Sequence, residues 1–215
     1  MKFQGSISNN RLGRKVILLS ILAILSIIVS AILMTTGDAK LLSGEIPEDA
    51  PAIEQPTPME VQGYTVPSKQ PRYLYLDEGK AAIRIMPLGV TSRNRLQSPA
   101  NVHDVGWYKK SSLPGEPGAM IIDGHVSSWT TKGVFYDLEA YKIGDRFQLE
   151  RGDGKRFTYE VQQIKIYEAS SVDMGLVQKP INSSAPGLNL ITCTGKVIEG
   201  TSEFSHRLVV FTKQI

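Results

Sequence analysis

Residues 188–195 read LNLITCTG, a short apolar run that ends at a glycine. Its alternation suits a β-strand, and Gly195 predicts a turn directly after Cys193. Similar short runs recur along residues 72–215, separated by Pro-Gly and Gly-Asp-Gly turn signals. These other runs cover residues 81–86, 119–122, 146–149, 157–167 and 207–211. The pattern predicts a mostly β domain, either a barrel or a sandwich.

The composition excludes several classes of protein. The chain has 215 residues, of which 41% are hydrophobic and 21% are charged, with a single cysteine. One cysteine cannot build a disulfide framework or a CxxC metal ribbon, and the composition is not collagen-like or that of a disordered chain. The net charge is +3, but residues 1–15 carry four basic side chains and no acidic one. Because the remaining chain is nearly neutral and offers no basic stripe, we exclude nucleic acid as a partner.

Residues 16–34 form an apolar segment, VILLSILAILSIIVSAILM, without a charged side chain. A helix of this length covers about 28 Å, close to the ~30 Å hydrocarbon core of a bilayer. A cleaved signal peptide is the alternative, but its apolar region usually has about 7–15 residues, and no clear cleavage site follows Met34. The basic leader 1–15 places the amino terminus in the cytoplasm. We therefore predict an uncleaved, single-pass anchor in the cell membrane, with the rest of the chain outside the cell.

The extracytoplasmic part divides at Pro71. Residues 35–71 hold six of the twelve prolines and show no hydrophobic period, so they are predicted to form a semi-stiff linker. Residues 72–215 are enough for one hydrophobic core and form the predicted globular domain. Short helical turns are expected in it near residues 134–141 and 171–178.

Cys193 is a single thiol in a domain that is predicted to be exported, where cysteines are usually paired. A buried structural cysteine is one interpretation, because free cysteines are among the most buried residues. A reactive nucleophile is the other interpretation. A nucleophilic cysteine needs a general acid or base and a group that stabilises an oxyanion.

Three histidines and one arginine are candidates for these roles. His125 follows an apolar run, at a point where a strand emerges from the core. His103 precedes Asp104 and is typical of a surface-turn histidine that bonds to its neighbour. His206 and Arg207 are adjacent, and neighbours on a strand point to opposite faces, so only one of them can face a given site. An arginine among apolar neighbours needs a carbonyl or anionic partner, unless it lies on an edge strand in solvent.

The order GHV at His125, LITC at Cys193 and HRLVVF at Arg207 resembles the sortase family of cysteine transpeptidases. The segments DVGWYKKSSLPGEPGAMIIDGHV, GVFYDLEAYKIGDRF and LNLITCTG are most similar to its class F branch. The resemblance covers about residues 80–213 and implies a closed eight-stranded β-barrel with short helices. One position departs, because many sortases have TLxTC and Asn189 stands in place of the first threonine. The nucleophile is intact, but any substrate contact from position 189 is altered.

The resemblance also implies a reaction. Sortases act as thiol peptidases and transpeptidases at the Gram-positive cell wall. They cut an LPxTG-like sorting signal of secreted proteins between threonine and glycine, and join the acyl group to an amine of a cell-wall precursor. Cys193 is then the nucleophile, His125 the general acid and base, and Arg207 a donor to the substrate carbonyl or oxyanion. Thr192 is expected to add its backbone or hydroxyl to the oxyanion pocket. No metal or cofactor is implied.

Other interpretations fit the motifs less well. L,D-transpeptidases have a glycine before the cysteine and an arginine two residues after it, where this chain has Thr192 and Gly195. Papain-like hydrolases have the opposite order of cysteine and histidine, and serine hydrolases need a GxSxG motif. A metal site of Asp123, His125 and Cys193 lacks ligand spacing. The last alternative is a degenerate, non-catalytic sortase-like binding domain on the cell surface. A test of thiol reactivity distinguishes this domain from an active cysteine enzyme.

Overall fold

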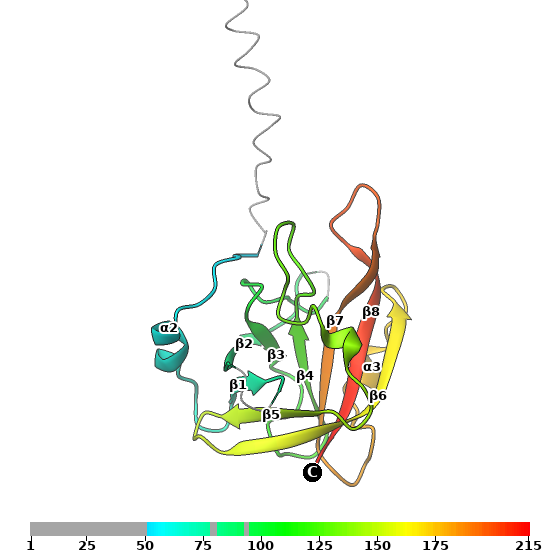
Figure 1. Ribbon diagram of the computed structural model, residues 1–215. Helices are drawn as coiled ribbons and strands as arrows, with labels where there is room; N and C mark the ends of the chain where they lie inside the picture. Colours follow the sequence, from blue (N-terminus) through cyan, green and yellow to red (C-terminus); the bar gives the residue numbers. More distant parts are fainter. Residues whose placement is uncertain (1–50, 78–80, 93–94) are drawn as a thin grey trace, which may run out of the picture. The chain divides into compact units, whose positions relative to one another are not determined.

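The computed structural model describes residues 51–77, 81–92 and 95–215, and a closed β-barrel is its main feature (Figure 1). Eight strands close the barrel in the order β1-β2-β3-β4-β7-β8-β6-β5. The strands are β1 (Pro71–Tyr75), β2 (Ile83–Leu88), β3 (Val105–Tyr108), β4 (Ala119–Gly124), β5 (Arg146–Arg151), β6 (Arg156–Glu168), β7 (Gly187–Val197) and β8 (Phe204–Gln214). The short helices are α2 (Pro58–Gly63), η1 (Leu138–Ala140) and α3 (Met174–Val177). The predicted barrel and both predicted helical turns are confirmed.

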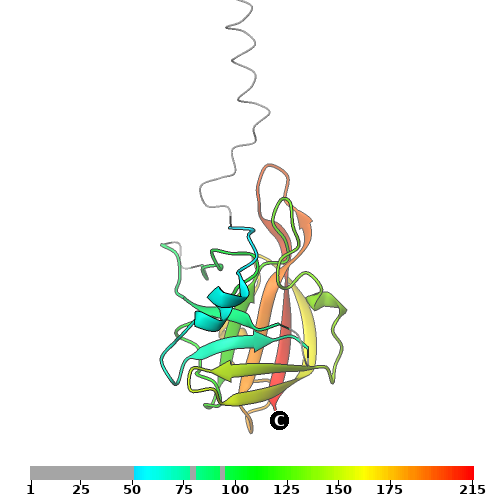
Figure 2. The same cartoon turned by 60° about the vertical axis from the view of Figure 1, so that its left-hand side comes forward.

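Strands β4, β7 and β8 lie side by side in both views of the barrel (Figures 1 and 2). The β4–β7 pair is parallel and aligns Asp123 with Ile191. The β7–β8 pair is antiparallel and aligns Cys193 with Arg207. The carboxyl ends of β4 and β7 and the amino end of β8 therefore meet at one end of the barrel.

Alternation along these three strands produces two apolar clusters, one on each face of the sheet. The inward face fills the barrel core with Met120, Ile122, Leu188, Leu190, Leu208 and Val210. The outward face carries a second cluster, in which Ile121, Ile191, Val209 and Phe211 pack with Val177 of α3. By the same period of two, the side chains at positions 123, 193 and 207 continue the outward face. We call this surface the outer face of β4–β7–β8.

Three details differ from the sequence-based expectation. Strand β1 was not predicted, and it begins at Pro71, which the sequence analysis assigned to the linker. Strand β3 was not predicted either, because Gly106 interrupts its apolar pattern; a Cβ at this position would lie 1.9 Å from Leu88 Cδ1. The predicted turn at Gly195 is wrong, since β7 continues to Val197. Gly195 has a φ of +84°, and the register with β8 shifts between Thr194 and Val197, so the glycine forms a β-bulge.

Residues 51–70 belong to the predicted linker, and they make hydrogen bonds with the barrel domain. The Ala52 N–H donates to the Ala100 carbonyl at 2.8 Å, and the Val102 N–H donates to the Ala52 carbonyl at 3.0 Å. Further along, the Tyr64 hydroxyl donates to the Ile85 carbonyl of β2 at 2.6 Å. Helix α2 between these contacts begins with a capping box of Thr57 and Glu60.

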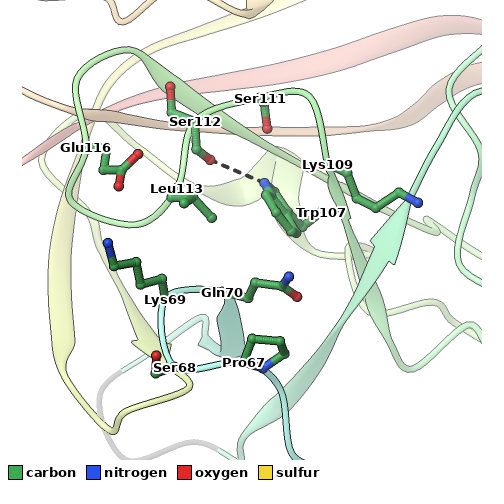
Figure 3. A pocket seen from close by; sticks show the side chains of 10 residues that line it. All are labelled: Pro67, Ser68, Lys69, Gln70, Trp107, Lys109, Ser111, Ser112, Leu113 and Glu116. Atoms are coloured by element: carbon green, nitrogen blue, oxygen red, sulfur yellow. Dashed lines mark hydrogen bonds between the residues drawn. The ribbon is translucent and has the colours of Figure 1, made fainter.

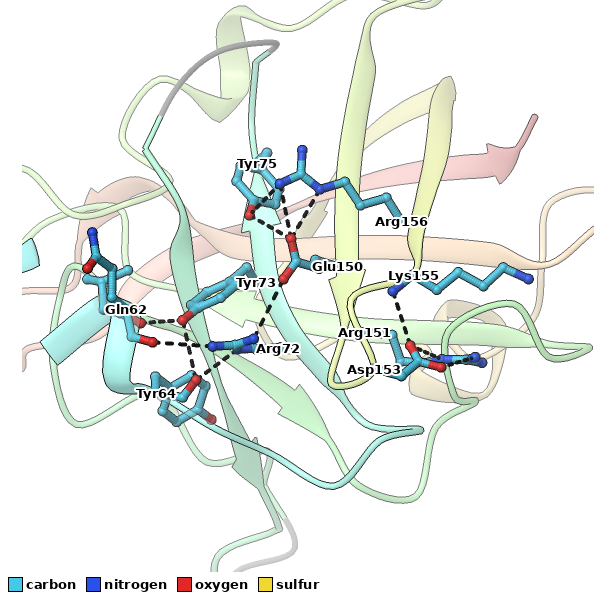
Figure 4. A network of polar contacts seen from close by, with 11 residues as sticks. Gln62, Tyr64, Arg72, Tyr73, Tyr75, Glu150, Arg151, Asp153, Lys155 and Arg156 are labelled. Atoms are coloured by element: carbon cyan, nitrogen blue, oxygen red, sulfur yellow. Dashed lines mark hydrogen bonds and ion pairs between the residues drawn. The ribbon is translucent and has the colours of Figure 1, made fainter. Parts of the chain in front are cut away.

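A polar network fixes the end of this segment to the first strand (Figure 4). Arg72 Nε donates to the Tyr64 carbonyl at 2.8 Å, and the Arg72 guanidinium lies 4.6 Å from the centroid of the Tyr73 ring. The Tyr73 hydroxyl donates to the carbonyls of Val61 and Tyr64. Glu150 of β5 accepts from the Tyr75 hydroxyl at 3.0 Å. The segment is therefore anchored to β1 as well as β2.

The predicted leader 1–15, the predicted membrane anchor 16–34 and linker residues 35–50 lie outside the described residues. Among the residues that are described, no helix combines the length and apolar character that a membrane crossing requires.

We expect a fragment of residues 51–215 to be more stable than a fragment of residues 72–215 by about 2–4 kcal/mol. The shorter fragment loses several hydrogen bonds, and each contributes a net 0.5–1.5 kcal/mol as a rough average. Urea unfolding of both fragments measures the difference. Tyr64→Phe in the longer fragment is the matched control, since it removes only the hydroxyl bond to Ile85 and should cost about 1 kcal/mol. Equal stability of the two fragments would contradict a structural role for residues 51–71.

Candidate active site

The β7–β8 register places Cys193 directly opposite Arg207. The neighbouring strand β4 ends at Gly124, and His125 follows it directly. All three side chains line one cavity of about 270 Å³. The structure therefore brings together the predicted nucleophile, histidine and arginine, although 68 residues separate His125 from Cys193 in the chain.

Two loops form the walls of this cavity. One follows β4 and contributes Val126, Ser127, Ser128 and Trp129, and the other joins β7 to β8. Both loops extend from the same end of the barrel in both views (Figures 1 and 2). The β7–β8 connection contributes Val197, Ser202, Glu203 and Phe204, and Pro51 and Ser98 complete the lining. Pro51 shows that the segment before the barrel reaches the cavity wall.

The Cys193 thiol is protonated at rest. Burial raises the pKa of this thiol above its ordinary value, and the charges of Asp123 and Glu203 raise the pKa further. Arg207 acts in the opposite direction and lowers the pKa of the thiol, followed by a smaller effect of Arg95. Desolvation is the largest of these effects, so the thiolate is a minor form of the free protein.

The His125 ring is held by a backbone carbonyl. Its Nε2 lies 2.8 Å from the Pro99 oxygen, and since a carbonyl only accepts, Nε2 carries the proton in the neutral ring. Nδ1 is then the atom that gains or loses the second proton. Burial lowers the pKa of His125, while the bond to Pro99 raises it to a smaller extent. The neutral ring is therefore the resting form.

The loop that carries Pro99 is fixed at several points. Ala52 bonds to both sides of Asn101, and the Val134 N–H donates to the Val102 carbonyl at 2.8 Å. Arg84 of β2 forms a bidentate ion pair with the buried Asp104, at 2.9 and 2.8 Å. Such two-point pairs restrict geometry strongly. The position of the Pro99 carbonyl, and hence of the His125 ring, is set by this loop.

Arg207 and His206 point to opposite faces, as alternation requires. Arg207 Nη1 donates to the Phe204 carbonyl at 3.0 Å and to the His206 carbonyl at 2.9 Å. His206 instead pairs across the sheet with Thr194, and its Nδ1 lies 2.8 Å from Ser205 Oγ. Of the two neighbours, Arg207 is the one that lines the cavity with Cys193.

Other predicted residues have structural contacts. Thr192 is buried and its hydroxyl donates to the Gly124 carbonyl at 2.7 Å, so its side chain lies on the face opposite Cys193. The predicted partner of His103 is wrong, since its Nε2 lies 2.9 Å from the Ile53 oxygen and Asp104 binds Arg84. His103 and Asp104 therefore both hold the loop in place, through separate contacts with Ile53 and Arg84.

Asn189, the departure from the sortase motif, supports the segment after β6. Its Nδ2 donates to the Val177 carbonyl at 2.7 Å and to the Lys179 carbonyl at 3.1 Å. The side chain is fully buried. Asn189 therefore holds α3 against the outer face of β7.

Sequence reasoning missed three groups of this site. Asp123 was considered only as a metal ligand, yet its position two residues before His125 predicts that both lie on one face of the strand. Ser98 and the Pro99 carbonyl carry no such signal, because the loop reaches the site through long-range contacts. Nothing in the local pattern near residue 98 indicates that contact.

A larger cavity, of about 600 Å³, lies at the other end of β4 (Figure 3). Lys69 and Glu116 face one another across it, and Trp107 donates to the Ser112 carbonyl at its wall. Its lining has no cysteine or histidine. Within the residues that the structure covers, no three His, Cys, Asp or Glu side chains are grouped as metal ligands. Of these two cavities, the smaller one is lined by a cysteine, a histidine and an arginine.

The Sortase domain family matches residues 78–215. Among similar solved structures is the complex of Streptococcus agalactiae sortase C1 with MTSET, 25% identical, with a TM-score of 0.51 over 71% of each chain. A lid mutant of sortase A from Corynebacterium diphtheriae is 24% identical, with a TM-score of 0.51 over 73% of this chain and 75% of that chain. The second likeness concerns the fold alone. No curated protein sequence matches this chain.

Proposed function

The chain belongs to the sortase family of cysteine transpeptidases, and from this premise we propose the reaction and the roles of its residues. The substrate is an LPxTG-like sorting signal, which is cut between threonine and glycine. The acyl group is then joined to an amine of the cell wall. The cross-strand pair of Cys193 and Arg207, with His125 in the same cavity, is the observation that carries this proposal.

In the first half-reaction the Cys193 thiolate attacks the threonine carbonyl carbon. The developing oxyanion accepts hydrogen bonds from Arg207, which is already charged and faces the thiol. As the carbon–nitrogen bond breaks, the His125 imidazolium gives its proton to the leaving glycine amine. The products are a thioester on Cys193, a neutral imidazole and a released peptide with a free amino group.

In the second half-reaction an amine attacks the thioester. His125 accepts the proton of this amine, and the thiolate leaves as the new amide bond forms. The imidazolium and thiolate are thereby restored together. Burial disfavours both charged forms before substrate binds, so the reactive ion pair is a small fraction of the resting protein.

The outer face supports binding of an extended peptide beside Cys193. The outer cluster of Ile121, Ile191, Val209 and Phe211 continues the strands on which Asp123, Cys193 and Arg207 lie. These four side chains are buried, so apolar side chains upstream of the cleaved bond would contact the partly buried residues packed beside them, such as Leu96 and Met174. Thr192 contributes its backbone alone, because its hydroxyl bonds to Gly124.

We further propose that residues 16–34 anchor the protein in the membrane, with residues 1–15 inside and the catalytic domain outside. The charge pattern and the apolar length of the sequence support this arrangement. The assignment to class F rests on the three sequence segments quoted above.

Mass spectrometry of the intact protein tests the proposed function. The chain is incubated with a small library of LPxTG-like peptides, and then with triglycine or a diaminopimelate-type amine. The expected result is a covalent adduct on Cys193 that has lost the glycine side of the peptide and that the amine removes. A thiol that iodoacetamide alkylates, but that forms no adduct with any peptide, would favour the non-catalytic binding domain.

Arg207→Lys should lower kcat by about 10²–10³-fold with a smaller change in KM. Lysine keeps the charge but loses the planar fork, and removal of one oxyanion donor typically has this effect. Steady-state assays with a fluorogenic sorting peptide measure it. Arg95→Lys is the matched control, because Arg95 pairs with Glu203 in solvent and its charge is retained. Near-normal turnover of Arg207→Lys would mean that Arg207 does not contact the reacting carbonyl.

A further inference from the structure

Asp123 is an acidic residue on the catalytic face that the proposed reaction does not use. It is the last residue but one of β4 and is partly buried. In the parallel register it aligns with Ile191, two residues before Cys193 on the same face of β7. Its position on the outer face is therefore fixed by the same pairing that assembles the site.

The groups around Asp123 come from every neighbouring element. Ser98, Arg207 of β8 and the Gly124 backbone each lower the pKa of its carboxyl. The negative charge of Asp123 raises the pKa of the Cys193 thiol on β7. On the other side, β3 presents Gly106, which carries no charge. His125 at the end of β4, Glu203 of the β7–β8 loop and Arg95 complete the charged surroundings of the thiol.

We propose that Asp123 is a positioning residue of the active site, whose carboxylate competes with the Cys193 thiolate for the Arg207 guanidinium. One cation then faces two potential anions. When the carboxylate is charged, it offsets part of the attraction between Arg207 and the thiolate and also repels the thiolate directly. Both effects favour the protonated thiol. The catalytic meaning of this competition rests on the proposed function, but the electrostatic effect on the thiol does not.

The state of the carboxyl depends on pH. Burial raises the pKa of Asp123 from its ordinary 3.8 to about 7, against the lowering effects of Ser98, Arg207 and Gly124. Above that pH the carboxylate is charged and opposes ionisation of Cys193. The thiol therefore stays protonated, which is its less reactive form, until the carbonyl oxygen of a bound substrate accepts hydrogen bonds from Arg207. The two groups titrate as a coupled pair.

The test measures alkylation of Cys193 against pH in the full-length chain in detergent. Since Cys193 is the only cysteine, iodoacetamide incorporation reports on it alone. In Asp123→Asn the midpoint of the alkylation profile should move to lower pH, because the variant removes the charge and keeps the shape. Glu116→Gln is the matched control: it removes the same charge at the other end of β4 and should leave the midpoint unchanged.

Two further measurements keep the test decisive. Asp123→Ala removes the same charge with a smaller side chain, so it should move the midpoint in the same direction and tests the proposal even if Asp123→Asn does not fold. Glu203→Gln should also have a smaller effect, because Glu203 contributes less than Asp123 to the thiol. An unchanged midpoint in a folded Asp123→Asn protein would overturn the proposal. So would equal shifts in Asp123→Asn and Glu116→Gln, which would indicate a general effect of net charge.

Unfolding provides a readout that needs neither thiol nor substrate. The folded carboxyl binds its proton more tightly than the unfolded one, so the unfolding free energy should fall as pH rises from about 4 through 7. Asp123→Asn lacks this loss, and its stability relative to wild type should increase across the same range. A constant difference between the two proteins would contradict a raised pKa at Asp123. If no acyl-enzyme forms with any peptide while these shifts occur, the proposed function fails and the role of Asp123 stands.

Discussion

Cys193→Ala should abolish the acyl-enzyme and all transpeptidation while the barrel stays folded. The variant removes the only thiol of the chain and replaces it by a smaller side chain on a strand whose hydrogen bonds are unchanged. Intact mass spectrometry with a sorting peptide measures the adduct, and a fluorogenic peptide with triglycine measures turnover. Circular dichroism and urea unfolding check the fold.

Thr194→Ala is the matched control for this variant. Thr194 is the next residue on β7, pairs with His206 and donates to Glu139, away from the cavity. It should keep near-normal turnover. Activity that persists in Cys193→Ala would remove the cysteine mechanism altogether, and equal losses in the two variants would point to damage of the strand.

His125→Ala should lower transpeptidation by about 10²–10⁴-fold, the usual cost of losing a general acid and base. The thiol should still react with iodoacetamide, because Cys193 and Arg207 remain paired. His206→Ala is the matched control, since this histidine lies on the opposite face of β8. A comparable loss in His206→Ala would mean that the face assignment of the two histidines is wrong.

The pH profile gives His125→Ala a second signature. Turnover needs the thiolate and the imidazolium together, so the wild-type rate should follow a bell whose limbs belong to the coupled pair. Burial lowers the pKa of His125 and raises the pKa of Cys193, so the acid limb should lie below the ordinary histidine value and the alkaline limb above the ordinary cysteine value. Without the imidazole the residual rate should rise as a single limb with thiol ionisation. A bell that persists in His125→Ala would show that another group donates the proton.

Local patterns predict the strands that carry the site. The runs before His125 and through Cys193 and Arg207 became β4, β7 and β8, because each has the alternation or apolar content that a half-buried strand needs. The same alternation allowed only one of His206 and Arg207 to face the site, and the pairing with β7 shows that Arg207 lies opposite the thiol. It would also have selected Asp123 as a neighbour of His125.

The remaining features depend on contacts that no local window contains. The parallel register of β4 and β7, the closure of β1 on β5 and the hydrogen bond from His125 to the Pro99 carbonyl join segments far apart in the chain. Gly195 illustrates the limit for a single residue. A positive φ serves a turn and a β-bulge equally well, and only the pairing with β8 decides between them.

The parallel pairing of β4 with β7 also sets the order in which the site can assemble during folding. Strands β7 and β8 are joined by a short connection, so this hairpin can bring Cys193 beside Arg207 early. The β4–β7 contacts close a much longer loop, and contacts of such sequence separation form slowly. We therefore expect His125 and Asp123 to reach the thiol only when β4 docks. A chain that has formed the hairpin alone would hold the cysteine next to the arginine without the proton donor or the opposing carboxylate, so we expect its thiol to react with alkylating reagents but not to complete a transfer.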